Sequence, residues 1–114
     1  MPDKCKPDDI EDDDHPVQVT PSDDREDLIK WSAAVLDAMA NGKRLAVLDM
    51  ISTKELSVGE LSQAVGLSQS ALSQHLSKLR SSHLVSFRRE GQTIYYSCSS
   101  RTVREVLRLL KEMF

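Results

Sequence analysis

Short polar side chains recur at helical spacing between residues 68 and 82. If this segment is a helix, then Leu72, Leu76 and Leu79 define its buried side, and at about 100° per residue the polar positions point outward. The outward residues of interest are Gln69, Ser70, Ser73 and Gln74. Because glutamine can pair bidentately with adenine and serine can donate or accept a hydrogen bond, this face predicts contacts with the edges of DNA bases.

Hydroxyl and basic side chains flank this face and could bind the phosphates of a duplex, since each neutralised phosphate releases counterions. Lys78 and Arg80 lie in the same segment, and Arg88 and Arg89 follow in a strand-like stretch. Side chains alternate along a strand, so Arg88 and Arg89 face opposite ways, and only one of them is expected to reach DNA. The residues predicted to contact the DNA backbone are Ser68, Ser77, Lys78, Arg80, Arg88 and Arg89.

The outward polar face also has a plainer interpretation, because any surface helix of a soluble protein carries one. The elements before it favour DNA binding. Ser57 and Glu60 have the spacing of a capping box at the start of a short helix. Gly66 ends that helix, and Ser68 can cap the next one. Residues 57–82 are therefore expected to form a helix-turn-helix whose second helix enters the major groove.

A strand-like pair follows directly. Residues 84–89 form the first predicted strand, and residues 93–97 form the second, which is rich in β-branched and aromatic side chains. Glu90-Gly91-Gln92 can make the turn between them. A hairpin directly after the recognition helix is a wing, and its presence favours the DNA-binding interpretation over the plain polar face.

Two apolar stripes lie outside the helix-turn-helix and wing. One belongs to a first helix that Ser22 can cap, and the other to a last helix from about residue 100 to 113. They present more apolar surface than the 87 residues after residue 27 can cover, and a small core gains stability by packing against a second copy. We therefore expect a homodimer. The residues predicted at its interface are Leu28, Trp31, Val35, Val103, Val106 and Leu110.

These elements, with a further helix that begins near Lys43, predict a mainly α fold. It is a winged helix-turn-helix of five helices and a two-stranded β-hairpin. We assign residues 22–114 to this DNA-binding and dimerisation domain. Residues 1–21 hold all four prolines and an acidic run, and they are predicted to be a disordered tail. That tail is either a solvated leader or an arm that competes with DNA.

The net charge of −3 divides between these parts of the chain. Residues 1–27 carry eleven acidic and three basic residues, whereas residues 28–114 carry seven acidic and twelve basic ones. A basic folded part suits the binding of phosphates. The sequence has no apolar run of the roughly 20 residues that span a bilayer, and its first residues have no apolar signal core, so we expect a cytoplasmic protein.

The chain offers little for catalysis, metal binding or redox chemistry. Its two cysteines, Cys5 and Cys98, do not make a disulfide framework, and no two of its three histidines have the spacing of a metal site. It shows no Ser-His-Asp order, phosphate-binding loop or paired catalytic carboxylates. We expect no enzymatic activity and no cofactor. The alternative is a redox- or metal-responsive sensor repressor that uses Cys98 and Cys5.

The stretch from Leu36 to Tyr96 resembles the ArsR/SmtB family of bacterial repressors and, within it, the NolR-like regulators. The resemblance runs through Ala38-Met39-Ala40-Asn41-Gly42-Lys43-Arg44-Leu45, Glu55-Leu56-Ser57-Val58-Gly59-Glu60-Leu61, Leu67-Ser68-Gln69-Ser70-Ala71-Leu72-Ser73-Gln74-His75-Leu76-Ser77-Lys78-Leu79-Arg80 and Gln92-Thr93-Ile94-Tyr95-Tyr96. It implies a dimer whose first and last helices form the interface. It also implies repression of transcription from a double-stranded DNA operator that is an imperfect palindrome.

The same resemblance shows where this chain departs from the sensing members of the family. Ser57 and Gly59 stand where metal-sensing relatives place cysteines, and Asp49 stands where sulfur-sensing relatives place the first of two thiols. Other relatives place His and carboxylate ligands in the last helix, which here contains no His. We therefore expect that DNA release depends on neither a metal nor a dithiol within one subunit.

Overall fold

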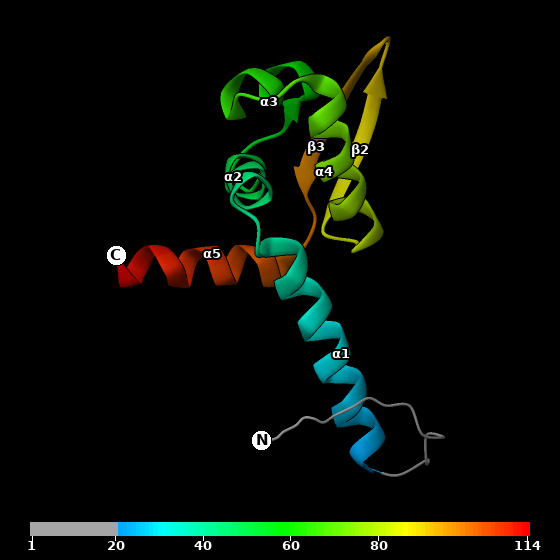
Figure 1. Ribbon diagram of the computed structural model, residues 1–114, viewed down its shortest axis with the longest axis vertical. Coiled ribbons are helices and arrows are strands. Elements are labelled where there is room, and N and C mark those ends of the chain that lie inside the picture. The colour runs from blue at the N-terminus through cyan, green and yellow to red at the C-terminus, as the bar shows by residue number, and fades with distance from the viewer. Residues whose placement is uncertain (1–20) are drawn as a thin grey trace. The chain divides into compact units, whose positions relative to one another are not determined.

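The computed structural model describes the backbone of residues 21–114 and the side chains from Asp24 onward. The elements in this part of the chain are α1 (Pro21–Met39), α2 (Gly42–Ile51), β1 (Leu56–Ser57), α3 (Val58–Val65), α4 (Gln69–Ser81), β2 (Val85–Glu90), β3 (Thr93–Cys98) and α5 (Arg101–Met113) (Figure 1). The predicted acidic tail, residues 1–21, lies outside the described residues apart from Pro21, at which α1 begins. The chain divides into two units, Met1–Lys30 and Trp31–Phe114, and the core and the sheet lie within the second.

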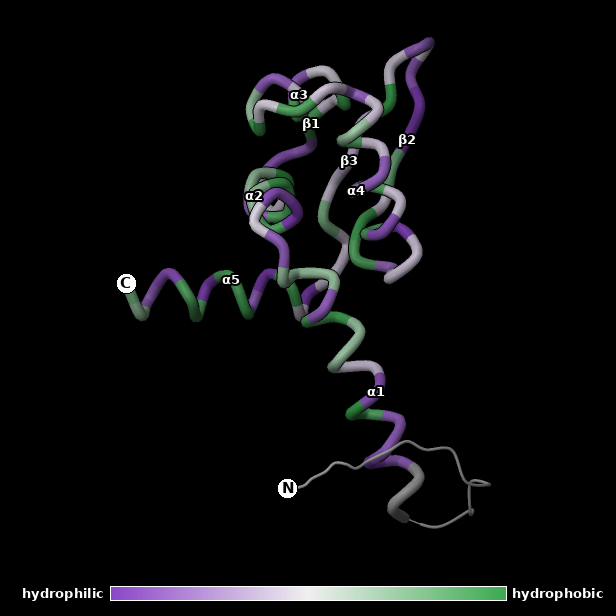
Figure 2. The backbone as a smooth tube through the Cα atoms, viewed as in Figure 1, coloured by the Kyte–Doolittle hydropathy of each residue, from purple (hydrophilic) through white to green (hydrophobic). Residues whose placement is uncertain are grey.

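The core of the second unit is built from aliphatic side chains of every helix. Leu48 of α2, Leu61 of α3, Leu72 of α4 and Val103 of α5 are completely enclosed. Figure 2 shows apolar and polar residues alternating along α5, as expected of a helix that packs on one side only. Because α4 is anchored through its leucines, its opposite side is left at the surface.

Local signals fix the start and end of α3. The Ser57 hydroxyl accepts a hydrogen bond from the Glu60 backbone N–H at 3.1 Å, and the Glu60 carboxylate accepts one from the Ser57 backbone N–H at 2.8 Å. Hydrogen bonding to the carboxylate by the Ser57 backbone N–H, and after it by the Ser57 side chain, lowers the pKa of Glu60. Gly66 ends the helix with φ 72°, a left-handed conformation that glycine adopts without steric cost. The predicted capping box and turn are present.

The end of α4 is unusual because a residue other than glycine takes the left-handed conformation. His83 has φ 60°. The Leu84 N–H donates to the Leu79 carbonyl at 3.1 Å, and the His83 N–H donates to the Arg80 carbonyl at 2.9 Å. This pair of bonds is a Schellman motif, which redirects the chain from α4 into the sheet.

The sheet is antiparallel, with strand order β1-β3-β2. The predicted winged helix-turn-helix is therefore confirmed with one correction, because the sheet formed by residues 56–98 has three strands in place of the two expected. β1 consists only of Leu56 and Ser57, which pair with Tyr96 and Tyr95 of β3. A two-residue strand is too short to leave a periodic pattern in the sequence. Its consequence is that the wing is hydrogen-bonded to the segment that leads into α3.

Candidate nucleic-acid interface

The outward face of α4 is where the sequence analysis placed it. Leu72, Leu76 and Leu79 are buried. The four residues predicted to contact bases are all exposed, namely Gln69, Ser70, Ser73 and Gln74. Ser77 is also exposed, and the Ser68 hydroxyl caps the helix by accepting a hydrogen bond from the Ala71 N–H at 3.2 Å. The helix therefore presents hydroxyl and amide groups without an apolar side chain among them.

Lys78 and Arg80, at the C-terminal end of α4, both have partners within the chain. The Lys78 ammonium lies 3.2 Å from the Asp37 carboxylate of α1. The Arg80 guanidinium donates to the Tyr96 hydroxyl of β3 at 3.0 Å and lies over the ring of Phe87, 5.7 Å from its centre. Arg80 thus ties α4 to the wing.

The two wing arginines face opposite ways, as the alternation of side chains predicts. Arg89 shares its face of β2 with Phe87, and this face is turned toward α4 because Arg80 of α4 packs on Phe87. Within residues 21–114, Arg89 has no hydrogen-bond or ion-pair partner, and it is exposed. Arg88 lies on the other face and is held by Glu55 and Glu90. Arg89 is therefore the wing arginine on the side of α4.

A polar hollow of about 290 Å³ opens between the start of α3, the start of α4 and the wing. Gln69 lines it from α4, and Gln92 and Thr93 line it from the wing. Gln92 and Thr93 were not among the predicted site residues. The available signal was the position of Gln92 in the predicted hairpin turn, since loop tips near a recognition helix reach the DNA backbone.

Residues for metal or redox chemistry are few in the described part of the chain. Among residues 21–114, no three His, Cys, Asp or Glu side chains gather as a metal site. Cys98 is buried, and its thiol donates to the Ser100 carbonyl at 3.6 Å. Cys5 lies outside the described residues.

The residues predicted at the dimer interface fall into two groups. Val35 and Val103 are buried in the core of their own chain, and Val106 is partly buried against that core. The exposed residues of the predicted set are Leu28, Trp31 and Leu110. Three further apolar residues of the C-terminal segment are exposed and were not among those predicted at the interface, namely Leu109, Met113 and Phe114.

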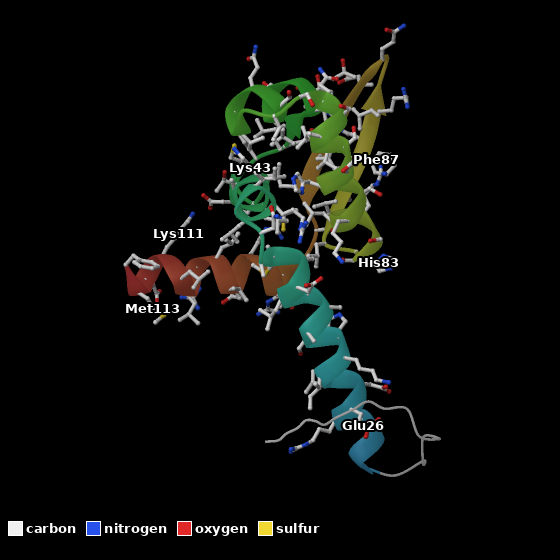
Figure 3. The ribbon with its side chains drawn as sticks, in the orientation of Figure 1. Glu26, Lys43, His83, Phe87, Lys111 and Met113 are labelled. Atoms are coloured by element: carbon white, nitrogen blue, oxygen red, sulfur yellow. The ribbon has the colours of Figure 1, made fainter. Side chains whose placement is uncertain are left out.

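An apolar groove of about 520 Å³ lies between α2 and α5. Leu45, Leu107 and Leu110 line it, and an ion pair of 2.6 Å between Lys111 and Asp49 lies at its edge. Figure 3 shows Lys111 and Met113 projecting from opposite sides of α5. The C-terminal half of α5 therefore carries uncovered apolar surface on more than one side.

Comparisons with known proteins agree with this architecture. The family model described as bacterial regulatory protein, arsR family, matches residues 41–86. The nodulation protein NolR of Rhizobium meliloti is 52% identical over 100 residues, which cover 88% of this chain and 81% of that protein. The transcriptional activator HlyU of Vibrio cholerae is 49% identical over 83 residues, covering 73% and 77%.

A solved structure adds the assembly of a relative. The homodimeric winged helix-turn-helix DNA-binding domain of a Mycobacterium bovis protein superposes with a TM-score of 0.74 at 32% identity. The match covers 84% of this chain and 89% of that one. Within residues 21–114, no helix combines the length and apolarity that crossing a membrane requires.

Proposed function

Because the chain belongs to the ArsR family of bacterial regulatory proteins, we propose that it is a repressor that binds a pseudo-palindromic operator as a homodimer in the cytoplasm. Its winged helix-turn-helix is the DNA-binding element of a transcription regulator. Of the two named relatives, one is a nodulation protein and the other is a transcriptional activator.

The observation that carries the proposal is the exposed face of α4. Ser70, Ser73 and Gln74 point away from the buried leucines, and Gln69 lies at the exposed start of the helix. Serine and glutamine match the donor and acceptor pattern of the major groove, and a cationic wing residue, Arg89, lies on the same side of the domain. A polar helix that is only a solvated surface would not need a wing arginine on the same side of the domain.

Two observations support the homodimer. The Mycobacterium bovis relative is homodimeric. In this chain the C-terminal half of α5 leaves Leu109, Leu110 and Met113 exposed, and Leu110 also lines the groove against α2. Two-fold symmetry would place two recognition helices in major grooves about one turn apart, or a multiple of one turn, on a pseudo-palindrome.

Repression is the simplest outcome of such binding, because a dimer on a promoter blocks polymerase. One relative is named an activator, so the position of the operator relative to the promoter decides the sign of the effect. In vitro transcription from a promoter that carries the operator should fall as the protein is added. A rise in transcript would replace the repressor proposal with an activator.

The proposal is tested by selecting bound fragments from genomic and random duplex DNA with the full chain. We expect enrichment of a palindromic sequence with half-sites about one helical turn apart, or a multiple of one turn. The matched control is the triple variant Ser70→Ala, Ser73→Ala, Gln74→Ala, which should bind DNA without enriching that sequence. Enrichment of nothing by the parent chain would reject the specific-repressor function.

A further inference from the structure

Arg88 is held on the face of the wing that points away from α4. Its Nε donates to Glu55 Oε2 at 2.9 Å, and its Nη2 donates to Glu55 Oε1 at 2.8 Å. Its Nη1 donates to Glu90 at 3.2 Å. The guanidinium also lies over the ring of Tyr95, 4.5 Å from the ring centre. One side chain thus makes a bidentate ion pair, a second ion pair and a cation–π contact.

The topology of the sheet makes this cluster a link between separate parts of the domain. Arg88 of β2 pairs with Tyr95 of β3, and Tyr95 pairs with Ser57 of β1. Glu55 lies two residues before Ser57, in the segment that leads into α3. The Arg88 side chain therefore crosses the central strand of the sheet. It connects the outer strand of the wing to the entry of the helix-turn-helix.

The outer strand of the wing, β2, has few other side-chain contacts with the helices: Arg80 of α4 packs on Phe87, and Val85 joins the core. Of the six residues of β2, only Val85 is buried. A strand at the edge of the sheet with so little buried surface depends on the contacts it makes with its neighbours to keep its position. Isolated surface ion pairs add little stability, but a bidentate arginine that also stacks on an aromatic ring has the geometry in which such pairs do contribute.

The same contacts leave the Arg88 guanidinium unavailable for binding phosphate. The hydrogen bonds that Arg88 donates to Glu55, and after them the one that it donates to Glu90, raise the pKa of its guanidinium. Two carboxylates beside one guanidinium neutralise its charge, so it would have to break both pairs to bind a phosphate. Arg89, on the other face, has no such partner among the described residues.

We propose that Glu55 and Arg88 form a clamp that fixes the wing relative to the helix-turn-helix, and that Arg88 does not bind DNA. The clamp positions the side of the wing that carries Arg89 and Gln92. It rests on the proposed function because that function is what makes this side face DNA. Glu55 and Arg88 are positioning residues, and the ratio of operator affinity to non-specific affinity depends on them.

Conservative variants separate the clamp from a phosphate contact because the two roles predict opposite results. Glu55→Gln releases Arg88. If Arg88 bound phosphate, this variant would bind operator more tightly and its specificity ratio would not change. The clamp predicts that the specificity ratio falls about threefold or more. Arg88→Lys keeps the positive charge but cannot make the bidentate pair with Glu55. The clamp therefore predicts the same fall in the specificity ratio, whereas a phosphate contact would survive.

Amide hydrogen exchange of the free protein tests the clamp without DNA. In Glu55→Gln and Arg88→Lys, backbone amides of residues 86–97 should exchange with solvent about threefold faster or more, while core amides such as that of Leu76 keep their rates. Arg89→Lys, on the same strand and opposite face, is the matched control and should leave wing exchange unchanged. Unchanged wing exchange together with an unchanged specificity ratio would overturn the clamp. A parent chain with no operator preference would reject the proposed function, and the exchange data would still decide the clamp.

Discussion

Three of the four cations expected to bind phosphate already have partners within the chain. Lys78 pairs with Asp37, Arg80 contacts Tyr96 and Phe87, and Arg88 pairs with Glu55. An exposed pair such as Lys78–Asp37 is weak enough for DNA to displace, whereas the three contacts of Arg88 are not. The composition of the surface shows which charges exist, and only the neighbours of each charge show which are free.

Arg89 should therefore carry a phosphate contact of the wing. Arg89→Ala should weaken binding to every DNA sequence by a similar factor and should reduce the slope of log affinity against log salt by about one. Arg101→Ala is the matched control, because Arg101 is exposed at the start of α5, at the opposite end of β3 from the wing turn. Titrations at several salt concentrations measure both slopes. Equal slopes for the parent and Arg89→Ala would show that Arg89 does not bind phosphate.

Base recognition should depend on the middle of α4. Gln74→Ala or Ser73→Ala should change which bases are preferred, with a loss of roughly 1–3 kcal/mol for each good base contact removed. Gln63→Ala removes an exposed amide from α3, outside the recognition helix, and should leave the base preference as it is. Repeating the DNA selection with each variant reads the preference directly. If neither α4 variant alters it, a different face of the domain enters the groove.

At the scale of the elements, the residue that ends α4 has a strained backbone conformation. His83 holds a left-handed conformation that costs a residue with a Cβ about 1–2 kcal/mol. His83→Gly should therefore raise the free energy of unfolding by about 1 kcal/mol, after the entropy of the more flexible glycine chain is subtracted. Denaturant unfolding at a fixed protein concentration measures it.

The neighbouring residue supplies the control for this prediction. Ser82 has φ −90°, which any residue adopts, so Ser82→Gly gains no relief. It should lower the free energy of unfolding by about 0.5–1 kcal/mol. The two substitutions, one residue apart, are expected to have opposite signs. If both destabilise the protein, the left-handed conformation at His83 is not costly.

The elements also show what the sequence could and could not predict. α3 and α4 were predictable because their signals are local: the capping box at Ser57, the turn at Gly66 and the leucine spacing of α4. β1 left no signal, because its two residues are a strand only through pairing with β3. Likewise, Glu55 and Arg88 are 33 residues apart, and neither residue type indicates its partner. The sequence thus predicts elements that depend on local signals, whereas pairings between distant residues can be identified only from the folded structure.

At the scale of the whole molecule, the prediction of the dimer interface from the apolar stripes has a related limit. Val35 and Val103 are apolar at helical spacing, as Leu110 is, yet the first two complete the core of their own chain. Periodicity predicts that a side chain is buried, and it does not distinguish burial within one chain from burial against a second copy. The exposed residues of α5 are therefore a better guide to the proposed interface.

The homodimer should depend on Leu110, which is exposed at the groove between α2 and α5. Leu110→Glu would bury a charge twice in a symmetric interface, so we expect the dimer dissociation constant to rise at least tenfold. Sedimentation over a range of protein concentrations measures it. Gln63→Glu adds the same charge to α3 and should leave the dimer intact. A Leu110→Glu protein that stays dimeric at the lowest concentration would place the interface elsewhere.

The central claim is that two recognition helices, fixed by one dimer, read two half-sites on one face of the duplex. The most direct test uses the selected operator with five base pairs inserted between its half-sites, which turns one of them about half a helical turn away. The matched control carries the same five base pairs outside the half-sites. The account predicts that affinity for the internally extended operator falls to the non-specific level and that the control binds as the parent operator does. Equal affinity for both would contradict it.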